Sequence, residues 1–339
     1  MKHGEFFSDR RTFLKSLSVL AAGAVLAPSL RVLPALAAAQ FQRVNEKRLL
    51  MGTIVGITAL ADSSGRCEDA LGRAYAEIER LSAIMSRFDS RSALSSLNDA
   101  GRLDRAPTEL LDVIQHGQFL HRHSNGRFDV SITPVLTLLE RSMGKPGQAE
   151  LREALSLVDA SRLRQDGQKL WFEATGMSAT LDGVAKGYIA DCAAEVLRRE
   201  GVEHFMIDAG GDIRVQGFSN GLDRPWHVAI EDPNKHGDYP AVLKMRNGAV
   251  ATSGGYEVFF NPTRTSHHLV NPDTGSSPQY IKSVSVQAPT VMQADGLATA
   301  LSLMHPREAL RLTASLPGHA CLLVTSSGAR LTSSSWNNV

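Results

Sequence analysis

A carboxylate and a hydroxyl stand at helical spacing near the C-terminal end of the sequence. Asp295 and Thr299 are four residues apart in the run Ala-Asp-Gly-Leu-Ala-Thr-Ala, so they would share one face of a helix. Oxygen ligands suit a hard cation such as Mg²⁺, which leaves room for substrate phosphates. A helix cap, or a hydroxyl bonded back to the helix backbone, would explain the same pair without a metal.

A second segment begins a predicted helix and reads Leu-Asp-Gly-Val-Ala-Lys-Gly-Tyr from Leu181. Its glycines would let backbone N–H groups approach a phosphate, and a helix N-terminus favours negative charge. Lys186 adds a cation. The alternative is structural, with Asp182 as the cap of the helix and Lys186 as a solvated side chain.

Two further segments carry paired glycines. Gly210 and Gly211 precede Asp212 between two predicted strands, where they indicate either close approach of the backbone to a ligand or an ordinary hairpin turn. The other pair lies between Ser253 and Tyr256. For Gly210 and Gly211, the sequence does not distinguish the two interpretations.

The adjacent histidines His267 and His268 precede the turn sequence Asn-Pro-Asp-Thr-Gly. Neighbouring residues on a strand point to opposite faces, so the two side chains are poor candidates for one metal site. One of them facing a site as an acid or base is the more plausible chemistry. An isolated histidine pair is also compatible with no catalytic role.

Composition excludes several other classes of protein. The 36 Lys and Arg residues are nearly balanced by 35 Asp and Glu, which argues against a nucleic-acid partner. The usual fingerprints of dehydrogenases, P-loop NTPases, zincins and α/β-hydrolases are missing from the sequence. The three scattered cysteines form no CxxC, so we expect three buried free thiols, with one disulfide as the alternative.

The elements that would position these residues follow an α+β pattern with antiparallel character. Helical periodicity is found at 66–86, 108–121, 184–198, 291–304 and 306–315, and Pro134 would open a further helix. The predicted strands are 47–60 with a break at Met51-Gly52-Thr53, 205–207, 213–215, 227–230, 241–245, 249–252, 284–287 and 320–325. We expect residues 40–339 to form one domain.

Residues 1–39 are predicted to be an export signal. The pair Arg10-Arg11 is followed by a weakly apolar stretch and then by small residues at cleavage-type spacing, which resembles a twin-arginine signal, although Asp9 stands where Ser or Thr is usual. An uncleaved anchor is disfavoured because the apolar run is shorter than about 20 residues and contains Pro28. We therefore expect export of the folded protein, cleavage near residues 37–39 and a periplasmic location.

Taken together and in this order, the segments resemble the ApbE family, the FAD:protein FMN transferases. The matching pieces span essentially the whole mature chain. They are Met51-Gly52-Thr53, Met85-Ser86-Arg87-Phe88, 92–98, Phe128-Asp129, 181–188, 209–212, 226–233, 252–256, 267–275 and 294–299.

This resemblance implies a fold of duplicated T-fold-like halves, with mostly antiparallel sheets, packed helices and FAD in a cleft. It also implies a reaction in which a Thr or Ser hydroxyl of an acceptor protein attacks the FMN-side phosphorus of FAD and AMP leaves. Such a reaction needs a cation beside the pyrophosphate, donors for its oxygens and a base for the hydroxyl. The implied cofactors are FAD, as substrate, and Mg²⁺.

The resemblance also implies roles for individual residues. By motif match, the metal ligands are Asp295, Thr299 and the carbonyl of Ala185, and His268 is the base. The nucleotide cleft would be lined by Asp182, Lys186, Gly210, Gly211 and Asp212, and FAD would be contacted by Met51, Asn98, Ser253 and Tyr256.

The sequence departs from the family pattern at three positions. Gly255 stands where Asp is common, so any contact from that carboxylate is lost. Asn271 replaces a frequent Asp, and Ser131 stands where Thr is usual. None of these changes removes the proposed metal ligands.

Two other functions share the same pocket and stay open from the sequence. One is a periplasmic FAD pyrophosphatase, in which water replaces the acceptor hydroxyl, and the other is a non-catalytic FAD-binding protein. The expected partners are the twin-arginine export machinery and an acceptor flavoprotein subunit of a membrane electron-transfer complex. A nitrous oxide reduction system is one candidate for that complex.

Overall fold

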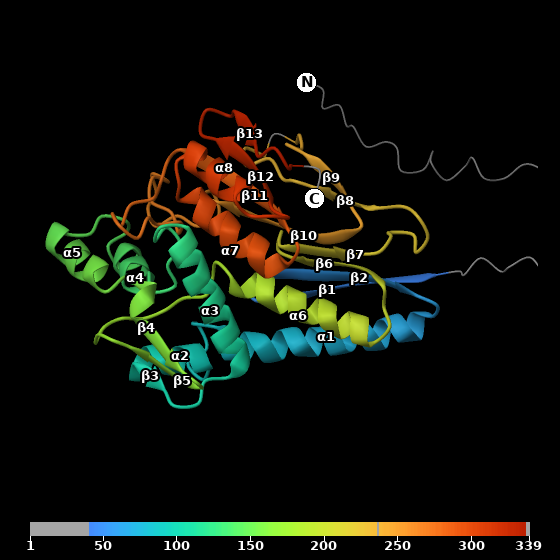
Figure 1. Cartoon of the computed structure of the whole chain (residues 1–339), viewed down its shortest axis with the longest axis horizontal. Coiled ribbons are helices and arrows are strands. Elements are labelled where there is room, and N and C mark those ends of the chain that lie inside the picture. Colours follow the sequence, from blue (N-terminus) through green and yellow to red (C-terminus); the bar gives the residue numbers. More distant parts are fainter. Residues whose placement is uncertain (1–40, 236, 337–339) are drawn as a thin grey trace, which may run out of the picture. The chain divides into compact units, whose positions relative to one another are not determined.

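The structure is a computed structural model that describes residues 41–235 and 237–336 (Figure 1). These residues belong to one compact unit that begins at Phe41. The predicted export signal lies outside the described residues. Within them, no helix is both long and apolar enough to cross a membrane.

An eight-stranded sheet in which all neighbouring strands are antiparallel forms the centre of this unit. The predicted antiparallel character is therefore confirmed. In spatial order the strands are β1 (Gln42–Leu50), β2 (Thr53–Ala61), β6 (His204–Ala209), β7 (Ile213–Gln216), β10 (Asn247–Gly254), β11 (Ile281–Ala288), β12 (Ala320–Thr325) and β13 (Arg330–Thr332).

Three helices cover one face of the sheet: α1 (Ser64–Met85), α6 (Ala185–Arg199) and α7 (Val291–Ser302) (Figure 1). They bury the apolar stripes that their 3.6-residue period produces. Alternate residues of β2 point into the same core, since Val55 and Ile57 are fully buried. A fourth helix, α8 (Pro306–Ala314), packs against β12 and α7.

The two halves of the sheet repeat one pattern. The hairpin β1–β2 is followed by α1, which packs on it, and the hairpin β10–β11 is followed by α7, which packs on that hairpin. This repetition and the mixture of helices with antiparallel strands confirm the expected fold class.

The remaining elements surround this sheet. The opposite face from α1 carries the two-stranded sheet of β8 (Trp226–Ala229) and β9 (Val242–Met245), which forms a second apolar cluster with the central strands. Beyond the end of α1 lie α2 (Ala93–Ala100), α3 (Thr108–His123), α4 (Thr133–Arg141), α5 (Gln148–Ser156), the 3₁₀ helix η1 (Ala160–Arg162), and a small sheet of β3 (Arg102–Leu103), β5 (Lys169–Phe172) and β4 (Leu163–Asp166) (Figure 1).

Local details differ from the sequence predictions. The elements α2, α5 and the small β3-β5-β4 sheet were not predicted, because segments of two to nine residues are too short to show a clear period. All three cysteines are free, and Cys67 and Cys321 are buried. Cys192 is only partly buried, so the prediction of three buried thiols was wrong for this residue.

Candidate functional site

A cavity of about 470 Å³ opens where the loop before α6, the β6–β7 turn, the end of β10 and α7 meet. Seven of the predicted site residues line this cavity although they are spread over more than a hundred positions of sequence. They are Asp182, Lys186, Gly210, Ser253, His268, Asp295 and Thr299.

Asp295 is a buried carboxyl on the cavity wall, with an exposed fraction of 4%. It lies in the middle of α7, whose cap is Thr290, so the alternative of Asp295 as a helix cap is wrong. One of its oxygens accepts a hydrogen bond of 3.0 Å from the backbone N–H of Gly187. Burial, together with the nearby charge of Asp212, raises the pKa of Asp295 to about 8. A cation beside this carboxyl would favour its ionised form.

Thr299 follows Asp295 by one helical turn and faces the same cavity. Its hydroxyl lies 3.2 Å from the hydroxyl of Ser253 on β10. The loop before α6 approaches it closely, since a Cβ at Gly183 would lie 3.1 Å from the Thr299 hydroxyl oxygen. Carboxylate and hydroxyl oxygens thus converge at one place, and this donor chemistry fits a hard cation.

No cluster of three or more His, Cys, Asp or Glu side chains suited to a metal occurs among residues 41–235 and 237–336. A cation here would therefore need hydroxyl, carbonyl, water or substrate oxygens in addition to Asp295. Ala185 was predicted to supply a carbonyl; it is the first residue of α6 and is not among the residues that line the cavity. The metal ligands stay predictions.

Lys186 points into the cavity from the first turn of α6 and forms an ion pair with Asp212. Asp212 is 2% exposed and lies behind the lysine, outside the cavity lining. Burial opposes the charge of Lys186, but the two buried carboxylates Asp212 and Asp295 outweigh it and raise the pKa of the lysine. Lys186 therefore places a positive charge in the cavity at neutral pH. Its side chain is 34% exposed, so it is partly solvated as well as ion-paired.

The turn before α6 also excludes the structural interpretation of Asp182. The cap position of α6 is Val184, so Asp182 does not cap the helix. Its carboxylate instead accepts a hydrogen bond of 2.7 Å from Arg87 Nε. Gly210 and Gly211 form a hairpin turn between β6 and β7. Gly210 also lines the cavity.

His268 faces the cavity and His267 does not, as expected for neighbours on an extended segment. The backbone N–H of His268 donates to the carbonyl oxygen of Val258 at 3.1 Å, and its Nδ1 lies 3.4 Å from the same oxygen. With a proton on Nδ1, the other ring nitrogen is a free acceptor. Burial lowers the pKa of His268, so its ring stays neutral at pH values at which an ordinary histidine would be protonated.

Several residues predicted to contact FAD or to line the nucleotide cleft lie outside the cavity lining. They are Met51, Asn98, Gly211 and Tyr256. The side-chain amide of Asn98 donates to the carbonyl of Ala179 at 2.9 Å and accepts from its N–H at 2.7 Å, which anchors the segment that leads to Asp182. Direct contact of these residues with FAD stays a prediction.

His267 explains why position 255 carries no side chain. A Cβ at Gly255 would lie 2.8 Å from two ring atoms of His267, which is closer than real contacts. An Asp at this position would require the imidazole to move. The departure from the family pattern at Gly255 therefore matches the local packing.

Sequence reasoning missed several residues that line the cavity. Arg87, Phe88, Arg127, Asp129 and Glu257 are examples. Arg87, Phe88 and Asp129 stand inside segments that carried the family resemblance, and that position was the available signal. The others lie in loops whose approach to the cavity depends on the fold.

Comparison with known proteins agrees with the geometry. The sequence profile of the ApbE family matches residues 51–323. A protein of Haemophilus influenzae named FAD:protein FMN transferase is 30% identical over 282 residues, which are 77% of this chain and 81% of the relative. A protein of Vibrio cholerae with the same name is 29% identical over 67% of this chain and 71% of its own length.

Solved structures show the same fold. The crystal structure of the ApbE protein from Thermotoga maritima superposes with a TM-score of 0.80 at 26% identity, covering 88% of this chain and 99% of that one. The flavin transferase ApbE from Vibrio cholerae gives a TM-score of 0.77 at 24% identity, over 88% and 99% of the two chains. With the profile covering most of its length, this chain belongs to the ApbE family.

Proposed function

We propose that this ApbE-family enzyme transfers FMN from FAD to a Thr or Ser hydroxyl of an acceptor protein and releases AMP. The observation that carries the proposal is the convergence of His268, Lys186, Asp295 and Thr299 on one cavity. Its relatives named FAD:protein FMN transferase support the choice of FAD as the substrate.

In the proposed reaction, the acceptor oxygen forms a bond to the FMN-side phosphorus of FAD, and the bond from that phosphorus to the AMP oxygen breaks. The free ring nitrogen of His268 takes the proton of the acceptor hydroxyl. Its lowered pKa keeps His268 neutral, and thus able to act as a base, through the neutral range. Lys186 would place its charge beside the pyrophosphate, where AMP carries negative charge as it leaves.

A divalent cation, for which we propose Mg²⁺, would be held by Asp295 and Thr299, with the Ala185 carbonyl as a further ligand. When bound, it would neutralise negative charge on the phosphate oxygens. The raised pKa of Asp295 and the nearby hydroxyls of Thr299 and Ser253 support this assignment. A buried carboxyl of this kind needs a nearby positive charge to stabilise its ionised form, and a bound cation would supply it. Gly187 would hold the Asp295 carboxylate in orientation through its N–H.

The transfer is tested by incubating the mature protein with FAD, Mg²⁺ and an acceptor domain that carries a Thr-containing flavinylation motif. Flavin fluorescence that stays with the acceptor band on a denaturing gel, together with AMP in solution, is the expected result. Both signals should require Mg²⁺ and should be lost in Asp295→Ala. A Thr→Ala acceptor is the matched control.

Two other outcomes identify the alternatives. Release of AMP and free FMN at a rate that the acceptor does not change would make the protein an FAD pyrophosphatase. FAD that stays bound and intact with two different acceptors would make it an FAD-binding protein. Fluorescent acceptor formed equally well by Asp295→Ala would refute the proposed metal site while leaving the transferase intact.

We further propose that the protein is exported by the twin-arginine route and acts in the periplasm on a subunit of a membrane electron-transfer complex. The motif around Arg10-Arg11 supports the route. In cells that lack the twin-arginine transporter, fractionation should find the protein in the cytoplasm. Changing both arginines to Lys should have the same effect, and unchanged periplasmic yield would contradict the proposal.

A further inference from the structure

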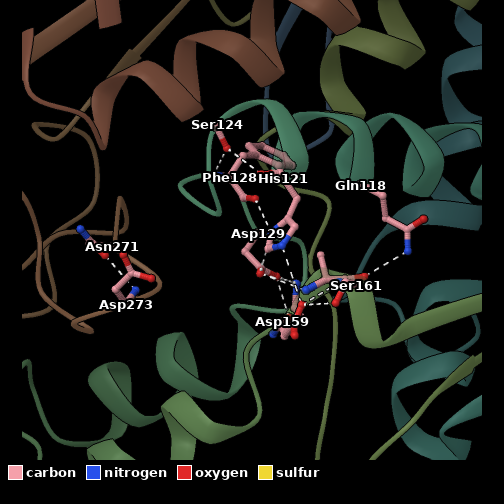
Figure 2. Close-up of polar contacts among 11 residues, drawn as sticks. Gln118, His121, Ser124, Phe128, Asp129, Asp159, Ser161, Asn271 and Asp273 are labelled. Carbon is pink, nitrogen blue, oxygen red and sulfur yellow. Dashed lines mark hydrogen bonds and ion pairs between the residues drawn. The ribbon is translucent and has the colours of Figure 1, made fainter. Parts of the chain in front are cut away.

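Asp129 is among the residues that line the cavity, and its carboxylate takes part in a network of hydrogen bonds (Figure 2). Its Oδ1 accepts from the backbone N–H and the hydroxyl of Ser131, at 2.7 and 2.6 Å. Its Oδ2 accepts from the backbone N–H of Ala160 at 3.0 Å and lies 3.1 Å from Nδ1 of His121. The side chain of Asp129 is 2% exposed, and its hydrogen bonds fix the conformation of the loop around it.

His121 is the ionisable partner in this network, and it lies in the last turn of α3, outside the cavity lining. Its Nδ1 is also 3.2 Å from the carbonyl oxygen of Phe128, and its Nε2 is 3.8 Å from Oδ1 of Asp159. The charged groups that act on the ring are these two carboxylates, Asp129 from the loop after α3 and Asp159 from the turn before η1. Both favour the imidazolium form.

The loop that Asp129 anchors forms part of the cavity wall. Phe128, Asp129, Val130 and Ile132 all line the cavity. The carbonyl of Val130 accepts a 2.8 Å hydrogen bond from the N–H of Thr180, two residues before Asp182. A Cβ at Gly183 would lie 3.4 Å from the Phe128 ring, so the loop also packs against the turn that opens α6. Movement of residues 128–132 would therefore displace the turn that carries Asp182.

We propose that His121 is a positioning residue whose imidazolium holds Asp129, and through it the 128–132 wall, so that flavin binding depends on the protonation of a histidine outside the cavity. The inference rests on the proposed function only for the identity of the flavin ligand.

The direction of the pH effect follows from the contacts. The hydrogen bond to Asp129 raises the pKa of His121, with burial opposing it. The charge-assisted part of this support is therefore complete below the ordinary histidine range and is lost as the pH rises through the raised value, where a neutral His121 can keep only an uncharged hydrogen bond to Asp129. His268 acts in the opposite sense, because it must be neutral to accept a proton and its pKa is lowered. The acid limb of the activity profile thus belongs to His268 and the alkaline limb to His121.

The test uses the mature chain, three histidine variants and Asp159→Asn. His121→Asn places an amide donor near Asp129 without a titrating charge, and His121→Leu removes the donor. His123→Asn is the matched control, since His123 is an exposed histidine of the same helix whose Nδ1 contacts the carbonyl of Phe119 at 2.8 Å. FAD affinity from flavin fluorescence, transfer rates between about pH 5.5 and 9, and the NMR titration of the histidines are measured for each.

We expect His121 to titrate above about 6.5, the ordinary histidine value, and His121→Asn to abolish the loss of FAD affinity at alkaline pH. His121→Leu should weaken FAD binding about tenfold at pH 6.5, which corresponds to about 1.4 kcal/mol, with a larger change in KM than in kcat. His123→Asn should leave both profiles as they are in the parent protein. Asp159→Asn should shift the alkaline limb to lower pH without touching Asp129.

A His121 that titrates at or below the ordinary value, or an alkaline limb that persists in His121→Asn, would overturn the inference. If His121→Leu fails to fold, His121→Asn and Asp159→Asn still decide the question. Protein that binds FAD with the expected His121 dependence but does not transfer FMN would refute the proposed function and leave this inference standing.

Discussion

At the contact between α6 and α7, adding one methyl group should reduce activity much more than it reduces stability. Gly187 lies in the first turns of α6, and a Cβ there would meet the backbone of α7, 2.6 Å from the carbonyl oxygen of Val291 and 2.7 Å from the Cα of Met292. Backbone atoms cannot rotate away as a side chain can. Gly187→Ala must therefore push the two helices apart.

The size of the displacement follows from these distances. Ordinary contacts begin at 3.4 Å, so the helices must separate by roughly 0.8 Å where the Cβ meets Val291. Overpacking of this kind costs about 1–3 kcal/mol, of which about 1 kcal/mol is recovered because Ala favours a helix more than Gly. The same movement lengthens the 3.0 Å hydrogen bond from Gly187 to Asp295. A misplacement near 1 Å in a catalytic site reduces rates about 100-fold.

We therefore expect Gly187→Ala to lower the rate of FMN transfer about 100-fold while the free energy of unfolding falls by no more than about 2 kcal/mol. Urea unfolding and the acceptor fluorescence assay measure the two quantities. Gly72→Ala is the control, because Gly72 lies in α1 with open space around its Cβ position, and it should unfold at the same or a higher urea concentration. A Gly187→Ala enzyme with a parental transfer rate would refute the argument that α6 sets the position of Asp295.

Three further predictions follow from individual contacts. Asp295→Asn should abolish Mg²⁺-dependent transfer, but the metal-free variant should be at least as stable as the parent protein at neutral pH. Burial raises the pKa of this acid to about 8, so the folded state disfavours its charged form. A large loss of thermal stability would contradict this. Burial lowers the pKa of His116 to about 4, so the free energy of unfolding should fall from pH 6.5 towards 4 by up to about 1.4 kcal/mol per pH unit, and His116→Leu should flatten that slope in urea titrations. Asn98→Ala should destabilise the protein by about 1–3 kcal/mol, because it leaves both backbone groups of Ala179 without their partners; a stable variant that loses only FAD affinity would instead indicate direct contact with the substrate.

The sequence by itself determined the elements with a long period and the order of the segments that carry chemistry. The stripe of α1 is readable because a 22-residue helix repeats its buried face several times, whereas β3, with two residues, shows no period at all. Asp295 and Thr299 were predicted to share a face because four residues make about one helical turn. That relation is local, so the chain alone fixes it.

The tertiary structure decided which of several local interpretations applies. Lys186 forms a partly buried ion pair with Asp212, 26 residues away, and the side-chain amide of Asn98 is hydrogen-bonded to Ala179, 81 residues away. The role of His121 likewise follows from its approach to Asp129 and Asp159, which come from two different segments. Contacts of this kind depend on how helices and loops pack after folding, and no spacing within one segment encodes them.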